Sequence, residues 1–254
     1  MYRRGYIVRR KPGWSRERFA SRWRAHYDVA ISIPGFMDPV PRYIQSDVRD
    51  DGEPGVEGLA LGFDGVGESI YSDRGACFAH MAERHARGDA DRAVADSSEF
   101  LTWEPFRATF GGDYVHLGGV DRARYKLFRF LSRPGGVEYA EFEKRISGAA
   151  RPFGLGAALT LGHRDDLVWT PATSVNPAFE GLLSIWVESL EEAWQVLAGD
   201  AWQAFEDAVE PVIDSAASLS LLGVEHILHD VPLEPGESVA DQDDARTGAD
   251  SGRP

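Results

Sequence analysis

The sequence has a single cysteine, only three methionines and no long apolar run. Cys77 alone excludes an intramolecular disulfide, and without a second thiol we expect no structural zinc site. No stretch approaches the ~18 apolar residues that a membrane helix needs. The N-terminal MYRRGYIVRR also lacks the apolar region of a secretory signal. The sequence therefore predicts a cytoplasmic protein with no membrane partner.

Positive charge is also scarce, because 27 Lys and Arg stand against 41 Asp and Glu, for a net charge of −14. Such a chain repels phosphates, which argues against nucleic acid as a partner. The segment Gly154-Leu155-Gly156 lacks the third glycine of a dinucleotide-binding loop. His80, Glu83 and His85 cluster without the i, i+4 spacing that places two imidazoles on one metal. We therefore expect a small-molecule partner, no metal and no nucleotide cofactor.

The most informative single segment is the stretch from Trp14 to Ile33, which predicts an amphipathic helix. Ser15 is placed to cap its start, and Pro34-Gly35 is placed to end it. At about 100° per residue one face collects the apolar and aromatic side chains: Phe19, Trp23, His26, Tyr27 and Ala30. His26 on this face has two interpretations. It is either a core histidine with satisfied ring nitrogens or an acid/base group that faces a cavity.

The remaining patterns predict an alternation of strands and helices. The expected strands are 1–10, 42–46, 65–72 and 114–117, with one helix starting after Asp73 and another over 96–102. The order β, α, β, β, α, β is the ferredoxin-like plan, a four-stranded antiparallel sheet with helices on one face. The Gly- and Asp-rich loop at 49–58 is a candidate lid over a site.

The same plan occurs twice in the chain. Arg10 to Gly13 recurs as Ser132 to Gly135, and the helix recurs as Glu138 to Phe153 with its spacing preserved. We predict repeats at 1–118 and 122–230, followed by an acidic tail at 231–254 whose composition is typical of disorder. The fold class is therefore α+β, with two tandem ferredoxin-like βαββαβ repeats.

The first repeat resembles a known family in two motifs. KPGWSRERFASRWRAH is similar to the opening helix of the EthD family, within the dimeric α+β barrel superfamily. Asp64-Gly65-Val66-Gly67-Glu68 is similar to that family's third strand. The resemblance covers most of residues 1–118. The second repeat departs from it, with Ala149 in place of His26 and Ser184 in place of Glu68, so we expect one site, in the first repeat.

This resemblance implies a fold and a range of reactions. Family members usually pair two chains, sheet against sheet, into a barrel, and two fused repeats would build that barrel within one chain. The protein would then be a monomeric pseudo-dimer or a homo-oligomer of such units. The ligand cavity would lie between a sheet and its helices. Related barrels act on oxygenated aromatic or polyketide-like molecules by dehydration, cyclisation, decarboxylation or oxidation by O₂, often without a cofactor.

Three residues are the catalytic candidates. His26 is suited to removing an acidic C–H proton next to a carbonyl and returning it to a departing hydroxyl. Glu68 would orient the ring or share the proton, although a solvent-facing strand residue is the alternative interpretation. Tyr43 would donate a hydrogen bond to a developing enolate oxygen, or would only line the barrel.

Four further residues are candidates for substrate binding. Trp14, Trp23 and Tyr27 offer flat rings for stacking on a substrate, with core or loop packing as the alternative for the tryptophans. Asp96 is interpreted as a helix cap or as a pocket residue.

Three functions remain open from the sequence. The favoured one is a cofactor-free lyase or cyclase that uses His26. The alternatives are a cofactor-free or haem-dependent monooxygenase and a non-catalytic small-molecule binding protein.

Overall fold

The computed structural model describes residues 1–49, 59–60, 62–102, 109–116, 124–154, 156–162 and 177–231. All but the first residue of the expected lid at 49–58 lies outside the described residues, as does the tail from 232 onward. The same holds for 117–123, so the boundaries between the repeats at 118 and 122 stay predictions.

Both repeats have the predicted βαββαβ order, with extra helices and short strands added. The first repeat contains β1 (Tyr2–Arg10), α1 (Arg16–Ile31), β2 (Arg42–Val48), β3 (Gly65–Tyr71), α2 (Arg74–Arg87), α3 (Asp89–Ser97), β4 (Leu101–Thr102) and β5 (Thr109–His116). The second contains β6 (Tyr125–Leu131), α4 (Tyr139–Ala150), the 3-10 turn Arg151–Phe153, β7 (Ala157–Leu161), β8 (Pro177–Phe179), β9 (Gly181–Val187), α5 (Leu190–Ala198), α6 (Asp200–Val209), the 3-10 turn Glu210–Val212 and β10 (Leu219–Asp230).

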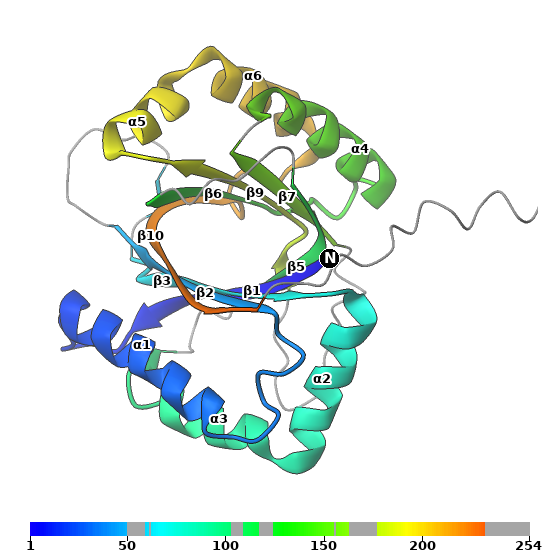
Figure 1. Cartoon of the computed structure of the whole chain (residues 1–254). Helices are drawn as coiled ribbons and strands as arrows, with labels where there is room; N and C mark the ends of the chain where they lie inside the picture. Colours follow the sequence, from blue (N-terminus) through cyan, green and yellow to red (C-terminus); the bar gives the residue numbers. More distant parts are fainter. Residues whose placement is uncertain are drawn as a thin grey trace, which may run out of the picture.

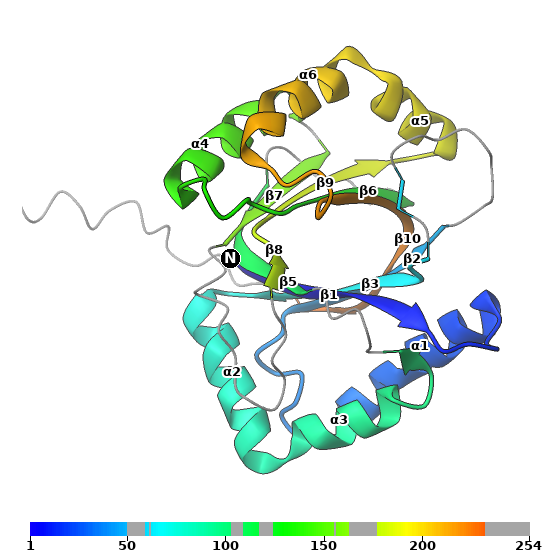
Figure 2. The same cartoon turned by 180° about the vertical axis from the view of Figure 1, so that it is seen from behind.

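The two sheets close into one barrel within the chain, which confirms the predicted fold class. The first repeat contributes the order β5-β1-β3-β2 and the second the order β10-β6-β9-β7. The sheets join where β2 pairs with β10 and where β5 pairs with β7, both antiparallel. Thus the last strand of each repeat pairs with the second strand of the other. Helices α1 to α3 cover one side of the barrel and α4 to α6 the opposite side (Figures 1 and 2).

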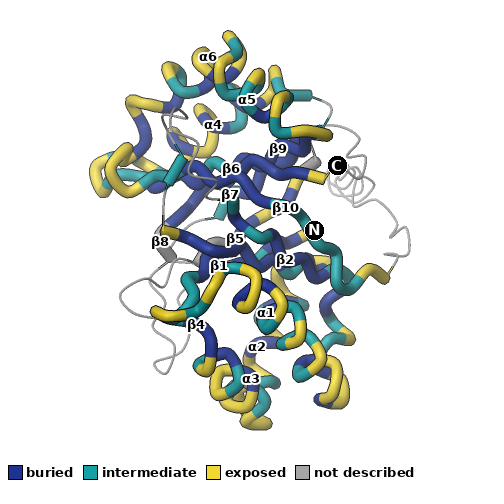
Figure 3. The backbone as a smooth tube through the Cα atoms, turned by 90° about the vertical axis from the view of Figure 1, so that its left-hand side faces the viewer, coloured by how far each residue is buried: buried dark blue, intermediate teal, exposed yellow. Residues whose placement is uncertain are grey.

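Apolar side chains from both repeats pack together inside the barrel. Ile7 and Val66 of the first repeat meet Phe128, Phe130 and Leu182 of the second in one buried cluster. Phe128 and Phe130 stack with ring centroids 5.8 Å apart. The strands are consequently buried on both faces, whereas the helices expose their outer sides (Figure 3). Because this packing covers the open faces of both sheets, the barrel needs no second chain to close it.

Helix ends follow the expected capping chemistry. The Ser15 hydroxyl accepts a hydrogen bond from the backbone N–H of Arg18 at the start of α1. Asp73 and Ser189 cap α2 and α5 in the same way, accepting from Ala76 and Glu192. These two caps occupy matched positions of the two repeats. The repeat found in the sequence therefore extends to the local structure that starts each helix.

The prediction of a helix over 96–102 was wrong. Helix α3 starts at Asp89 and ends at Ser97, and Leu101–Thr102 form a short strand against β1. Gly88 adopts a left-handed φ of 73°, which ends α2 and lets the chain re-enter a helix at once. The segment before Asp96 is helical with Ala93 and Ser97, four residues apart, on its buried side, while Asp91 and Arg92 face solvent. Asp96 consequently lies inside the last turn of α3 and is not a helix cap.

Candidate active site in the first repeat

The layers between sheet and helices differ sharply in the two repeats. We call the space between β5-β1-β3-β2 and α1 to α3 the first layer, and the space between β10-β6-β9-β7 and α4 to α6 the second layer. The second layer is a continuous apolar core with Phe142, Ile146 and Ala150 fully buried at its centre. The first layer also holds polar and titratable groups, which are Tyr6, His26, Tyr43, Gln45, His80 and Arg84.

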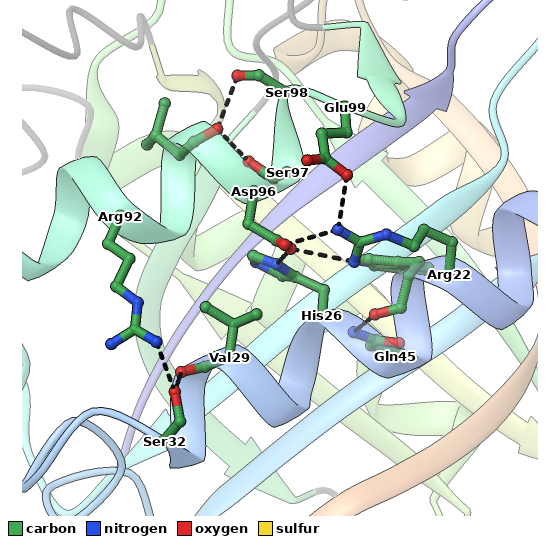
Figure 4. Close-up of polar contacts among 12 residues, drawn as sticks. Arg22, His26, Val29, Ser32, Gln45, Arg92, Asp96, Ser97, Ser98 and Glu99 are labelled. Carbon is green, nitrogen blue, oxygen red and sulfur yellow. Dashed lines mark hydrogen bonds and ion pairs between the residues drawn. The ribbon is translucent and has the colours of Figure 1, made fainter.

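His26 on α1 contacts Asp96 on α3. The two groups approach to 2.5 Å between Nδ1 and Oδ2, and their side chains are 14% and 19% exposed. Arg22, one turn earlier on α1, donates to both oxygens of the same carboxylate at 3.1 and 2.6 Å and also to Glu99 (Figure 4). Asp96 therefore holds the histidine ring from the Nδ1 side. Among the described residues, Nε2 of His26 has no hydrogen-bond partner.

Burial and charge act in opposite directions on this pair. Burial lowers the pKa of His26 below 6.5, and although Asp96 raises it, the charges of Arg22 and Arg84 add to the lowering. Burial would raise the pKa of Asp96, but hydrogen bonds from Arg22 and His26 hold it below its ordinary value. At neutral pH the pair is thus a neutral imidazole beside a carboxylate. The arrangement fixes the tautomer with the proton on Nδ1, and Nε2 is left as a base.

Tyr43 on β2 lies in a row of hydrogen bonds on the helix-facing side of the sheet. The Gln45 amide donates to the Tyr43 hydroxyl at 3.2 Å and to the Trp23 carbonyl at 3.1 Å. The hydroxyls of Tyr43 and Tyr6 are 2.9 Å apart. Burial raises the pKa of both tyrosines, so both carry their protons at neutral pH. Two phenol groups are therefore aligned in the first layer, and one of them donates to the other.

Trp23 and Tyr27 anchor α1 on the sheet, and Trp14 lies at the helix start. The Trp23 ring fills the space left by Gly65, where a Cβ would come within 2.2 Å of the ring. Tyr27 stacks on Tyr43 at 5.9 Å, and its hydroxyl is 2.9 Å from Nδ1 of His229 on β10. Trp14 packs against Phe100 at 6.4 Å. Trp23 is thus a core residue, while Tyr27 lies beside the tyrosine row.

Arg84 and His80 face the first layer from α2. They follow Cys77 at helical spacing along the inward stripe of this helix. Nδ1 of His80 lies 3.1 Å from the Tyr71 hydroxyl, and burial, aided by the charge of Arg84, lowers the pKa of His80 to about 4. The guanidinium of Arg84 lies over the Phe36 ring, 3.7 Å from its centroid. Its charge influences the pKa values of His26, Tyr6 and Tyr43.

Glu68 lies on the opposite face of the sheet from His26. Its side chain is fully buried inside the barrel, where it pairs with Arg3 and, at 2.7 Å, with Lys126 of the second repeat. Ser184, the residue matched to Glu68, accepts from Arg3 at 3.0 Å in the same cluster. The expectation that Glu68 orients the His26 ring is therefore corrected, because Asp96 makes that contact. Nor does Glu68 face solvent.

Four residues of the first layer escaped the sequence reasoning. Tyr6, Gln45 and Arg84 were not singled out, and His80 was considered only as a metal ligand. The one available signal was the helical spacing of Cys77, His80 and Arg84, which places all three on the inward face of α2. Within the described ranges, no group of three His, Cys, Asp or Glu side chains has an arrangement that could hold a metal. No described helix is long and apolar enough to cross a bilayer.

A haem at His26 does not fit the described side chains. Phe100 packs edge-on against the imidazole at 5.7 Å, and Asp96 holds Nδ1. Beneath α1 the sheet is covered by the Trp23 and Tyr6 rings, which occupy the places that side chains at Gly65 and Gly67 would take. A macrocycle as wide as haem would displace these rings. We therefore derive no step through haem.

The second repeat has different residues at the positions of the polar groups of the first layer. Its residues at the positions of His26, Tyr43 and Gln45, matched by helix spacing and strand register, are Ala149, Ala157 and Leu159. Arg129 takes the position of Tyr6 and is held by two hydrogen bonds to Glu206. This arrangement of polar groups is therefore confined to the first repeat among the described residues.

Comparison with known proteins supports the resemblance found in the sequence. The EthD domain family matches residues 11–102, which contain α1, β2, β3, α2 and α3. No protein of curated function matches the chain. The confirmed resemblance thus covers His26, Tyr43, Arg84 and Asp96.

Solved structures share the whole two-repeat fold. A proposed monooxygenase from Fusobacterium nucleatum subsp. nucleatum is 9% identical, with a TM-score of 0.54 over 91% of this chain and 95% of that chain. An anthrone oxidase-like protein is 10% identical, with a TM-score of 0.53 over 91% of this chain and 96% of that chain. At these identities the likeness shows the fold alone.

Proposed function

We propose that this protein, which carries an EthD domain at residues 11–102, is an enzyme that moves a proton on an oxygenated aromatic or polyketide-like small molecule. The observation that carries the proposal is the His26–Asp96 pair in a polar first layer, set against the apolar second layer with Ala149. A fold that needs only packing at this position uses alanine. The first repeat keeps a histidine and aligns it with a carboxylate.

The proposed reaction starts with removal of a C–H proton next to a carbonyl. Nε2 of His26 takes the proton while Nδ1–H stays bonded to Asp96, whose negative charge stabilises the imidazolium that forms. The electrons of the C–H bond move to the carbonyl oxygen, and the resulting enolate accepts a hydrogen bond from the tyrosine row, in which one of the Tyr43 and Tyr6 hydroxyls donates to the other. His26 then returns the proton to a β-hydroxyl, which leaves as water when the carbonyl reforms. The net change is a dehydration, and attack of the enolate on a second carbonyl would give a cyclisation.

The charge of Arg84 links the base to the tyrosines. It acts on the pKa values of His26, Tyr6 and Tyr43. His26 on α1, Arg84 on α2 and the Tyr6–Tyr43 row on the sheet all face the first layer. A substrate there has a base on the α1 side and donors on the sheet side.

An alternative use of the same site is cofactor-free oxygenation. An electron-rich enolate or phenolate, once formed by His26, is the species that O₂ attacks in such reactions, and two of the fold's solved representatives carry names of oxygen-using enzymes. Both functions require the same first step. They differ in whether O₂ is consumed.

The test is loss of proton transfer in His26→Ala. Anthrone and hydroxylated tetralones, whose C–H groups are acidic, are incubated with the protein in D₂O, and deuterium incorporation is followed by NMR with an oxygen electrode in parallel. We expect His26→Ala to lower the exchange rate about 10²- to 10⁴-fold. It should still fold, because the matched position of the second repeat holds Ala149.

The outcomes separate the possible functions. Exchange without O₂ uptake supports the lyase or cyclase, and exchange coupled to O₂ uptake supports the monooxygenase. If His26→Ala melts well below the parent yet exchanges deuterium at the parental rate, the histidine is a core residue. If every compound binds and none exchanges above the buffer rate, the protein is a binding protein and the catalytic proposal fails.

A further inference from the structure

Arg84 is a partly buried cation for which no anionic partner is found among the described residues. Its Nε atom is fully buried and makes no hydrogen bond. Its one described contact is the face of the Phe36 ring. Burial lowers the pKa of Arg84 to about 10. Since removing a guanidinium from water without a partner is costly, its retention on the inward stripe of α2 needs an explanation.

The polar groups around Arg84 are donors and positive charges. The tyrosines Tyr6, Tyr43 and Tyr71 and a second cation, Arg4, are the charged or titratable groups that act on its pKa beside burial. The arginines of the chain that contact carboxylates do so elsewhere, as Arg22 does with Asp96 and Arg87 with Glu83. Around Arg84 the first layer thus has a second cation and phenol groups, in a protein whose net charge is −14, while the Asp96 carboxylate is held by Arg22 and His26.

Building on the proposed function, we infer that Arg84 binds an oxyanion of the substrate. The substrate class is then planar organic acids, whose carboxylate or ionised phenol lies between Arg84 and the Tyr6–Tyr43 row. A guanidinium presents parallel N–H donors that match two oxygens, and it binds such anions more strongly than neutral groups. The Phe36 ring lies against Arg84, and the Tyr27 and Tyr43 rings stack on each other in the same layer.

The second repeat is consistent with this assignment. When the repeats are matched at the helix caps Asp73 and Ser189, Arg84 corresponds to Asp200, which is exposed at the start of α6. His80 corresponds to Val196, which packs against the apolar core. The cation and the polar groups near it are thus absent where His26 is also absent. The anion-binding group and the base occur in the same repeat.

Benzoate binding measured by titration calorimetry is the first test, with neutral benzamide as the matched ligand. We expect benzoate to bind more tightly than benzamide. Arg84→Gln should weaken benzoate binding about tenfold or more, because a charge-assisted hydrogen bond is lost, and Arg84→Lys should restore part of it. Arg87→Gln, three residues further along the same helix in a solvent-exposed ion pair, is the control and should leave the affinity unchanged.

A second probe separates the two sources of the oxyanion. 4-Nitrophenol turns yellow when it ionises, so a titration of the bound dye reports whether the site favours the phenolate. A lower ionisation pH in the parent, lost in Arg84→Gln, supports the phenolate, whereas benzoate binding without this shift supports the carboxylate. Arg84→Met should raise the melting temperature of the ligand-free protein, because it removes an unpaired buried charge.

Equal benzoate affinity in the parent and in Arg84→Gln would overturn the inference, as would a failure of benzoate and 4-nitrophenol to bind the parent at millimolar concentration. Unchanged benzoate affinity in Arg84→Gln, together with proton exchange that depends on His26, would sink only the choice of substrate class. Normal anion binding with exchange that is indifferent to His26 would sink only the catalytic proposal.

Discussion

Substitution of Glu68 by glutamine is a sharp test of the interior of the barrel. The Glu68 carboxylate is 0% exposed and lies between Arg3, also 0% exposed, and Lys126, 1% exposed. Lys126 additionally contacts Glu225 at 2.8 Å, and Arg3 contacts Ser184 and Thr160. Glu68→Gln keeps the shape of the side chain but removes the negative charge that lies between Arg3 and Lys126. The cluster joins both repeats, so the damage falls on the contact between the sheets.

The expected cost follows from the burial of the charges. Breaking a buried ion pair by removing one partner costs about 3–5 kcal/mol, which is a large share of the about 5–15 kcal/mol that stabilises an ordinary domain. The control is Glu141→Gln, which removes the exposed ion pair with Arg145 on α4. That pair contributes about 0.5 kcal/mol or less.

The measurement is urea unfolding of both variants as a function of pH. Burial would raise the pKa of Glu68, but the charges of Arg3 and Lys126 outweigh it and hold the pKa below 4.5. Because the pKa is lower in the folded state, the stabilisation by Glu68 is present above about pH 4.5 and is lost as the pH falls through the lowered value. Glu68→Gln should remove that part of the acid sensitivity. Turnover per folded molecule should be unchanged, since Glu68 faces away from His26.

The reasoning would be refuted if Glu68→Gln lost less than about 1 kcal/mol while turnover collapsed. That result would return Glu68 to the catalytic machinery and would mean that Arg3 finds other compensation. A loss of both stability and turnover is resolved by assaying below the unfolding temperature with the folded fraction measured by circular dichroism.

Two further predictions concern the first layer. Asp96→Asn should lower turnover about 10²- to 10⁴-fold and stability by about 1–2 kcal/mol, because Arg22 loses the carboxylate and keeps only Glu99. In the parent, the acid limb of the kcat/KM profile lies below pH 6.5, because burial lowers the pKa of His26. Since Asp96 raises that pKa, the limb should move to still lower pH in Asp96→Asn. An unmoved limb would mean that Asp96 does not act through the histidine. Gly65→Ala should destabilise the first repeat by about 1–3 kcal/mol, because its Cβ would come within 2.2 Å of the Trp23 ring, whereas Gly135→Ala meets nothing within 4 Å. Equal melting temperatures for the two glycine variants would contradict the packing of α1 described above.

The sequence alone determined the architecture and the position of the histidine. Helix α1 could be predicted because one of its faces is polar, so the 3.6-residue period shows on Phe19, Trp23 and His26. The repeat was visible because matched residues keep their spacing even where the chemistry changes, as at His26 and Ala149. These are local patterns, and a periodic pattern reports the environment of one element at a time.

Only the tertiary structure decided which strand residues share the site. Every residue of β9 is buried, as are nearly all of β3, because helices cover one face of each sheet and the other sheet covers the opposite face. Alternation along such a strand shows that neighbours face opposite ways, but it does not say which face meets the helices. For that reason Glu68 was placed beside His26 when it lies inside the barrel. His26 and Asp96 are 70 residues apart in the chain. Their contact depends on how α3 packs on α1, which no local sequence pattern predicts.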